Sequence, residues 1–158
     1  MAACQERHIT MMTSIENNPI KVFLDTNVII DALTLRDTSY RPSQRIIRNI
    51  AAKNIRGYIC SKQITDIYYV FRKYFKDEYE IRDKIITISE LMEILPLFKG
   101  DVLACLKTEM SDFEDAIIYE VAKLNMIKII ITNNINHFKR CEGMILTPEQ
   151  FLDLYSLE

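Results

Sequence analysis

The chain has 158 residues, of which 49% are hydrophobic and 27% charged, and its formal net charge is −2 at pH 7. This length fits one domain with a sizeable core, and the composition excludes a disordered, fibrous or disulfide-stapled protein. A near-neutral charge provides no overall basic surface for nucleic acid, although it does not exclude a local one.

The cysteine and histidine content limits the chemistry. The four cysteines are widely spaced and form no C-x-x-C pair, so neither a zinc ribbon nor a redox motif is predicted. With only His8 and His137, a zinc site built on several imidazoles is excluded. A catalytic metal would therefore need oxygen ligands, which favours Mg²⁺ or Mn²⁺.

Residues 1–19 are predicted to form an N-terminal extension, and residues 20–158 a single domain. The extension lacks the apolar stretch of a signal peptide, and the apolar runs elsewhere are too short to cross a membrane. We therefore expect a cytoplasmic protein without a membrane segment.

Hydrophobic patterning predicts alternating strands and helices through the first two thirds of the chain. In chain order we expect a strand at 21–25, helices at 26–36 and 43–54, a strand at 57–60, helices at 61–75 and 78–92, a weak strand at 93–98 and a helix at 100–110.

The last third carries sharper signals. Ser111 and Glu114 have the S-x-x-E spacing of a capping box, which predicts a helix that starts there and runs to about Leu124. The isoleucine-rich stretch 126–132 is the strongest strand signal of the chain. Further on we expect a turn or short helix at 133–138, a strand at 144–146 and, after the cap Thr147, a helix at 148–155.

Such alternation favours an α/β sandwich with a mainly parallel sheet. In open sheets of this class, ligands bind beyond the carboxyl ends of the strands. Polar residues at strand ends are therefore the first candidates for a functional site.

Five polar residues are candidates, and each also has a purely structural interpretation. Asp25 ends the first strand and suits a helix N-cap. Asp66 fits a solvated helix position. Asp112 and Asp115 share one helix face, where first-turn acids are favourable. Asn134 follows the strand at 126–132 and suits a turn.

Taken together, these residues indicate a common site. Asp25 and Asn134 follow two strands, and Asp115 lies on the helix that leads into the second one. Converging carboxylates repel one another unless a cation neutralises them, and a hard divalent ion with oxygen ligands is the natural partner. Such a site activates water and stabilises charge on a phosphate, which points to phosphodiester hydrolysis.

Four segments of this chain resemble the signature regions of PIN-domain ribonucleases, in order and in spacing. They are LDTNVIID at 24–31, ITDIYYVFRKY at 64–74, DFEDAIIYEVAKLN at 112–125 and IIITNNINHF at 129–138. The pattern is most similar to the bacterial VapC-type toxins of toxin–antitoxin pairs. The resemblance implies a three-layer α/β/α sandwich around a mainly parallel sheet, and Mg²⁺- or Mn²⁺-dependent endonucleolytic cleavage of RNA with 5′-phosphate and 3′-hydroxyl products.

The resemblance also implies roles for the acidic residues. Asp25 and Asp115 match metal-binding carboxylates, and Asp112 matches an additional acid that serves the metal or supports its ligands. Asp66 falls where the family usually carries glutamate; being shorter by one methylene, it fits a water-bridged contact.

Three further residues match supporting positions: Asn27, Thr132 and Asn134. Asn134 stands where many members carry aspartate. The missing negative charge favours one tightly held ion over two.

Substrate and partner contacts are predicted on two surfaces. Arg41, Arg45 and Arg48 recur at spacings of four and three and form either an RNA-binding stripe or a solvated helix face. The resemblance implies a homodimer and a small antitoxin that occupies the active-site groove. The aromatic segment at 67–71 is a candidate for either protein contact, and internal packing is the alternative.

Other function classes remain open. A haloacid-dehalogenase-like phosphatase needs a second aspartate two residues after the first. This chain has Asn27 there, which argues against that class. A non-catalytic PIN-like module that binds RNA or protein would agree with the departures at Asp66 and Asn134. An RNA-maturation nuclease that is not a toxin would use the same residues.

Overall fold

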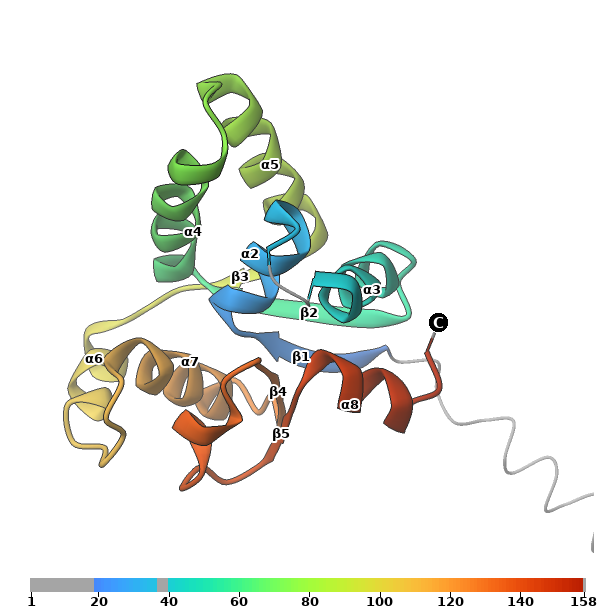
Figure 1. Ribbon diagram of the computed structural model, residues 1–158. Coiled ribbons are helices and arrows are strands. Elements are labelled where there is room, and N and C mark those ends of the chain that lie inside the picture. The colour runs from blue at the N-terminus through green and yellow to red at the C-terminus, as the bar shows by residue number, and fades with distance from the viewer. Residues whose placement is uncertain (1–18, 37–39, 158) are drawn as a thin grey trace, which may run out of the picture.

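Figure 1 shows the computed structural model, which describes residues 19–36 and 40–157. Apart from Pro19, the predicted N-terminal extension lies outside the described residues. Among the helices that are described, none combines the length and apolar character needed to cross a membrane.

A five-stranded sheet forms the centre of the structure, with the strand order β3-β2-β1-β4-β5 and every neighbouring pair parallel. Its strands are β1 (Ile20–Leu24), β2 (Ile55–Cys60), β3 (Glu93–Leu95), β4 (Ile129–Ile131) and β5 (Met144–Leu146). The chain order reverses between β1 and β4. In parallel sheets the carboxyl end of such a switch point is the usual place for a ligand.

Helices cover both faces of this sheet (Figure 1). One face packs against α2 (Thr26–Thr34), α3 (Tyr40–Ala51), α4 (Ser61–Tyr74), α5 (Glu78–Leu91) and α8 (Pro148–Leu154). The other face packs against α6 (Lys99–Cys105), α7 (Phe113–Leu124) and the 3₁₀ helix η1 (Ile135–Phe138). The expected three-layer α/β/α sandwich is confirmed, and its sheet is wholly parallel.

The two cores follow from the alternation of side chains along the strands. Val22 and Leu24 of β1 point into the core with α2 to α5, whereas Phe23 between them points into the core with α7. Burial on both faces explains why β1 and β4 are almost continuous apolar runs. These runs hold the strand ends that carry the polar residues.

Several element boundaries differ from the sequence-based expectations. The helix expected at 43–54 begins at Tyr40 and ends at Ala51, and β2 begins at Ile55 because it pairs with Ile20 of β1. The helix expected at 100–110 ends at Cys105, where the Thr108 hydroxyl donates to the Cys105 carbonyl and closes the last turn. The strand expected at 126–132 is shortened to Ile129–Ile131.

Candidate active site

Asp25 lies at the point where β1 ends and α2 begins, beside the carboxyl end of β4. Its backbone N–H donates to the Ile131 carbonyl at 2.9 Å, and this bond joins the two strand ends. Its side chain is the N-cap of α2 and accepts from the Asn27 backbone N–H at 3.4 Å. Both interpretations of Asp25 are therefore compatible, because a carboxylate at this helix start also faces the candidate site.

The Asp25 carboxyl is buried, with 2% of the residue exposed. Burial raises its pKa from 3.8 to about 6; a bond from the Thr132 hydroxyl opposes the rise, and the nearby negative charge of Asp115 adds to it. Burial and the neighbouring negative charge disfavour the ionised form of Asp25, and a bound cation would stabilise that form.

Thr132 supports Asp25 from the neighbouring strand end. Its hydroxyl donates to Asp25 Oδ2 at 2.7 Å and accepts from the Asn134 backbone N–H at 2.9 Å. The side chain is fully buried. Thr132 thus positions the carboxylate and the following turn together, while its supporting role in catalysis stays a prediction.

Asp112 and Asp115 come from the start of α7. Asp112 is the N-cap and accepts from the backbone N–H groups of Glu114 and Asp115 at 2.9 and 3.1 Å. The predicted capping box at Ser111 is therefore wrong by one residue: the carboxylate of Asp112 reaches both free N–H groups and begins the helix at Phe113. Glu114, which the capping box had explained, contacts Lys62 instead.

His137 is a residue of this site that the sequence did not reveal. Its Nδ1 lies 2.6 Å from Asp115 Oδ2, and its side chain is 41% exposed. Burial raises the pKa of Asp115, and the His137 contact opposes that rise. The sequence did contain a signal for His137. It follows the predicted site residue Asn134 by three positions, and residues three apart in a 3₁₀ turn lie on the same side.

Asp66 reaches the site from α4, but a lysine shares its carboxylate. Lys62 Nζ lies 2.5 Å from Asp66 Oδ2 and 2.9 Å from Glu114 Oε1, so it connects α4 with the start of α7. These contacts raise the pKa of Lys62 despite its partial burial, which keeps it charged. Asp66 is thus partly neutralised without a metal, unlike Asp25.

The predicted acids and amides share one cleft of about 270 Å³. Its lining includes the following predicted site residues: Asp25, Asn27, Asp66, Asp112, Asp115 and Asn134. Thr132 does not line the cleft but donates to Asp25, which does. The structure therefore brings the four sequence segments to one place, while the role of each residue in catalysis stays a prediction.

One buried acid that does not line the cleft, Asp31, had no role assigned from the sequence. Asp31 is 3% exposed and pairs with Arg36 at 2.8 Å. Its other oxygen accepts from the Asn133 amide at 2.8 Å, and Arg36 also reaches Asn27 Oδ1 at 3.5 Å. This network fixes Asn27 and the turn after β4 with respect to each other.

The three arginines proposed for RNA binding do not line this cleft. Arg41 and Arg45 line a separate hollow beside Asn133 and the start of α8, where Arg45 donates to the Leu157 carbonyl at 2.7 Å. Arg48 is exposed further along α3. Their contact with RNA stays a prediction, and Arg45 has a structural role in holding the C-terminal segment.

The donor atoms fit a divalent cation. One ligand atom each from Asp112, Asp115 and His137 lie within 4.8 Å of one another, and Asp25 is close enough to Asp115 to raise its own pKa. Beside the oxygen ligands predicted from the sequence, this group offers one imidazole nitrogen. Carboxylates with one imidazole suit Mn²⁺, and the oxygen set alone suits Mg²⁺.

The parallel α/β/α sandwich with acidic residues at the β1–β4 switch point can be assigned to a protein family by its similarity to known proteins. The PIN domain model matches residues 21–136, and the chain belongs to this family. It is also 29% identical, over 144 residues, to "Ribonuclease VapC1" of Aquifex aeolicus; the match covers 88% of this chain and 98% of the relative.

Solved structures agree with this assignment. A VapBC2 complex from Rickettsia felis, bound to a promoter DNA fragment, matches with a TM-score of 0.58 and 25% identity over 80% of this chain and 96% of that one. A toxin–antitoxin complex from Klebsiella pneumoniae matches with a TM-score of 0.59 and 24% identity over 80% and 97% of the two chains, and it supports the fold.

Proposed function

We propose that this protein is a Mg²⁺- or Mn²⁺-dependent endoribonuclease that acts in the cytoplasm as the toxin of a toxin–antitoxin pair. The observation that carries the proposal is the buried Asp25, which shares one cleft with Asp112, Asp115 and His137 at the carboxyl ends of β1 and β4. Membership of the PIN domain family and the similarity to a VapC-type ribonuclease support it.

Asp25, Asp112, Asp115 and His137 would hold the cation. When bound, such an ion neutralises charge on a phosphate and lowers the pKa of a nearby water molecule. Hydrolysis then joins a water oxygen to phosphorus and breaks the bond to the 3′-oxygen, which takes up a proton. The products are a 5′-phosphate and a 3′-hydroxyl.

The protein's own contribution is to hold the acids in place before the reaction. The Thr132 hydroxyl orients Asp25, the Asp112 carboxylate starts α7 so that Asp115 faces the cleft, and His137 orients Asp115. Groups fixed in this way do not need to reorganise during the reaction. Asp66, which Lys62 already pairs, would act on water or substrate rather than as a direct ligand.

The proposed partners are a small antitoxin and a second copy of this chain. Exposed aromatic side chains on and after α4, Tyr69, Tyr74 and Tyr79, are 64%, 46% and 79% exposed and offer a contact surface. Tyr69 also lines the acidic cleft. An antitoxin segment that covers Tyr69 would therefore reach the active site, and a basic side chain on it would complement the carboxylates.

Cleavage of a mixed-sequence RNA with Mn²⁺, Mg²⁺ or EDTA tests the activity. We expect metal-dependent cutting by the wild type, and its loss in both Asp25→Asn and Asp115→Asn. Asp83→Asn on the exposed side of α5 is the matched control, and it should cut normally. Thermal melting with and without Mn²⁺ should show a metal-induced rise for the wild type and Asp83→Asn.

The outcomes separate the candidate functions. Cutting that persists in EDTA would refute the metal-dependent mechanism. If neither cutting nor a melting shift is seen, the protein is a non-catalytic PIN-like module.

A further inference from the structure

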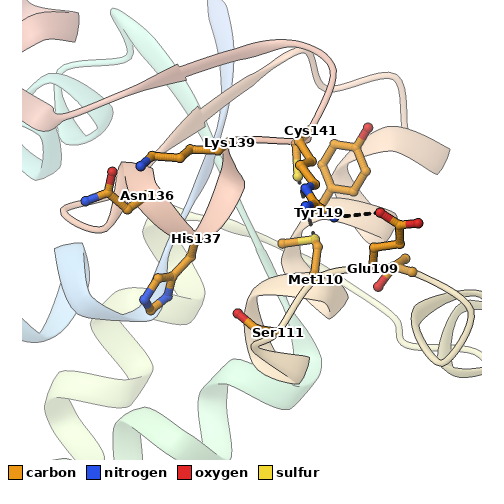
Figure 2. Close-up of a pocket in the computed structure, with 10 residues that line it drawn as sticks. Glu109, Met110, Ser111, Tyr119, Asn136, His137, Lys139 and Cys141 are labelled. Carbon is orange, nitrogen blue, oxygen red and sulfur yellow. Dashed lines mark hydrogen bonds and ion pairs between the residues drawn. The ribbon is translucent and has the colours of Figure 1, made fainter.

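A second, larger pocket adjoins the acidic cleft. It encloses about 500 Å³ between the loop at 108–111, the Tyr119 side chain of α7 and the segment 136–141. His137 lines both spaces, so they meet at that side chain. We name this space the lateral pocket; Figure 2 shows the residues that line it.

Two sulfur atoms and a tyrosine form one side of the lateral pocket. Cys141 Sγ lies 3.6 Å from Met110 Sδ, and the Tyr119 hydroxyl accepts from the Glu142 backbone N–H at 3.0 Å, which holds the ring in place. Burial raises the pKa of the Cys141 thiol, so it stays neutral. Polarisable sulfur and a fixed aromatic ring suit contact with a flat, aromatic ligand.

The opposite side of the lateral pocket carries polar and cationic groups. In Figure 2, Asn136, His137 and Lys139 stand apart from Met110, Tyr119 and Glu109 across the pocket. Lys139 is exposed, and no salt bridge engages it within the part of the chain that the structure describes. The exposed amide of Asn136 offers both a donor and an acceptor.

The other cation of the pocket is already paired. Arg140 forms an ion pair with Glu109 at 2.6 Å, drawn as a dashed line in Figure 2. This pair is neutral overall and joins the two loops at the rim. Lys139 is therefore the cationic side chain of the pocket that stays available to an anionic ligand. It lies a short way from the acidic cleft, whose carboxylates would repel such a ligand.

We propose that the lateral pocket binds the RNA nucleotide next to the scissile phosphate and thereby sets where the protein cuts. The base lies against Met110 and Tyr119, Asn136 contacts its polar edge, and Lys139 binds its phosphate. A pocket of this size, with sulfur and aromatic groups beside the neutral Arg140–Glu109 pair on one side and Asn136 and Lys139 on the other, suits a single nucleotide. The inference rests on the proposed ribonuclease function and specifies its substrate contact.

The two loops that form the pocket suit this role. One lies directly before α7, whose start carries Asp112 and Asp115, and the other runs from η1, which carries Asn136 and His137, into the loop that follows it. A nucleotide held between them is therefore placed with respect to the reacting phosphate. Specificity on loops beside a rigid catalytic scaffold is a common arrangement.

The test uses Lys139→Gln and Asn136→Ala, with Lys76→Gln in the exposed α4–α5 turn as the matched control. Binding of a fluorescent single-stranded RNA is measured in EDTA by anisotropy at several salt concentrations. We expect Lys139→Gln to weaken binding roughly fivefold and to reduce the slope of log affinity against log salt by about 0.7, because one phosphate contact is lost. Lys76→Gln should bind like the wild type.

Cut sites are then mapped on a mixed-sequence RNA with Mn²⁺. We expect Asn136→Ala to change the nucleotide preference next to the cut by about fivefold or more, because a side-chain contact to a base edge is removed. A change in folding alone would lower the rate at all sites equally. Melting temperatures of the variants verify that they fold.

The results separate this inference from the proposed function. If the wild type cuts RNA and both pocket variants bind and cut like Lys76→Gln, the nucleotide pocket is refuted while the ribonuclease stands. If neither the wild type nor any variant cuts RNA but Lys139→Gln alone loses RNA affinity, RNA still binds in the lateral pocket and the catalytic proposal fails. If Lys139→Gln weakens only the binding of a protein partner, the pocket is a protein contact and the inference is wrong.

Discussion

Replacing Asp25 by asparagine is expected to stabilise the metal-free protein while abolishing its activity. The folded state raises the pKa of this carboxyl from 3.8 to about 6. A shift of about two pKa units corresponds to about 3 kcal/mol of free energy of unfolding. Because the raised pKa belongs to the folded state, this stability is present below pH 4 and is lost as the pH rises through 6.

An asparagine carries no charge and avoids this loss at neutral pH. It keeps one acceptor for the Thr132 hydroxyl but cannot also accept well from the Asn27 N–H, which costs about 1 kcal/mol. The net gain is therefore about 2 kcal/mol at pH 7.5. For a domain of this size we expect a rise in melting temperature of roughly 4–8 °C.

The assay is thermal melting in EDTA from pH 4 to pH 8, with Asp83→Asn as the control on the exposed side of α5. The melting temperature of Asp25→Asn should exceed that of the wild type at pH 7.5 but not at pH 4, where the wild-type carboxyl is protonated. Addition of Mn²⁺ should raise the melting temperature of the wild type more than that of the variant. A variant that melts below the wild type at pH 7.5, or a gain that does not depend on pH, would refute the reasoning.

Three further changes have defined outcomes. Thr132→Val removes the donor to the buried Asp25 carboxylate and should lower the free energy of unfolding by roughly 2 kcal/mol at pH 7.5, with a smaller effect at pH 4, in denaturant titrations. Ile67→Ala empties a fully buried core position and should cost about 2–5 kcal/mol by the same measurement, at either pH. His137→Asn replaces the nitrogen donor by an oxygen and should weaken Mn²⁺ binding about tenfold in calorimetric titrations, while Mg²⁺ binding changes less. Equal losses for both ions would show that His137 acts only by positioning Asp115 and does not bind the metal.

The fold could be predicted well because its signals are local. The apolar runs of β1 and β4 and the cap at Thr147 depend on neighbours in the chain, and the structure confirms them. Element ends were less accurate where a distant partner decides them. β2 begins two residues before its predicted start at residue 57, because Ile20 pairs with Ile55 and no local pattern indicates this pairing.

Local sequence patterns already indicate which acids end strands or begin helices, and the order and spacing of the segments place Asp25 and Asp115 in one family pattern. The surroundings of these acids depend on how the chain folds. Folding placed His137 against Asp115, joined Asp66 to Glu114 through Lys62, and separated Arg41 and Arg45 from the cleft. Burial, charge coupling and ion pairing depend on distances between segments far apart in the chain, and these distances are set only once the sheet has assembled.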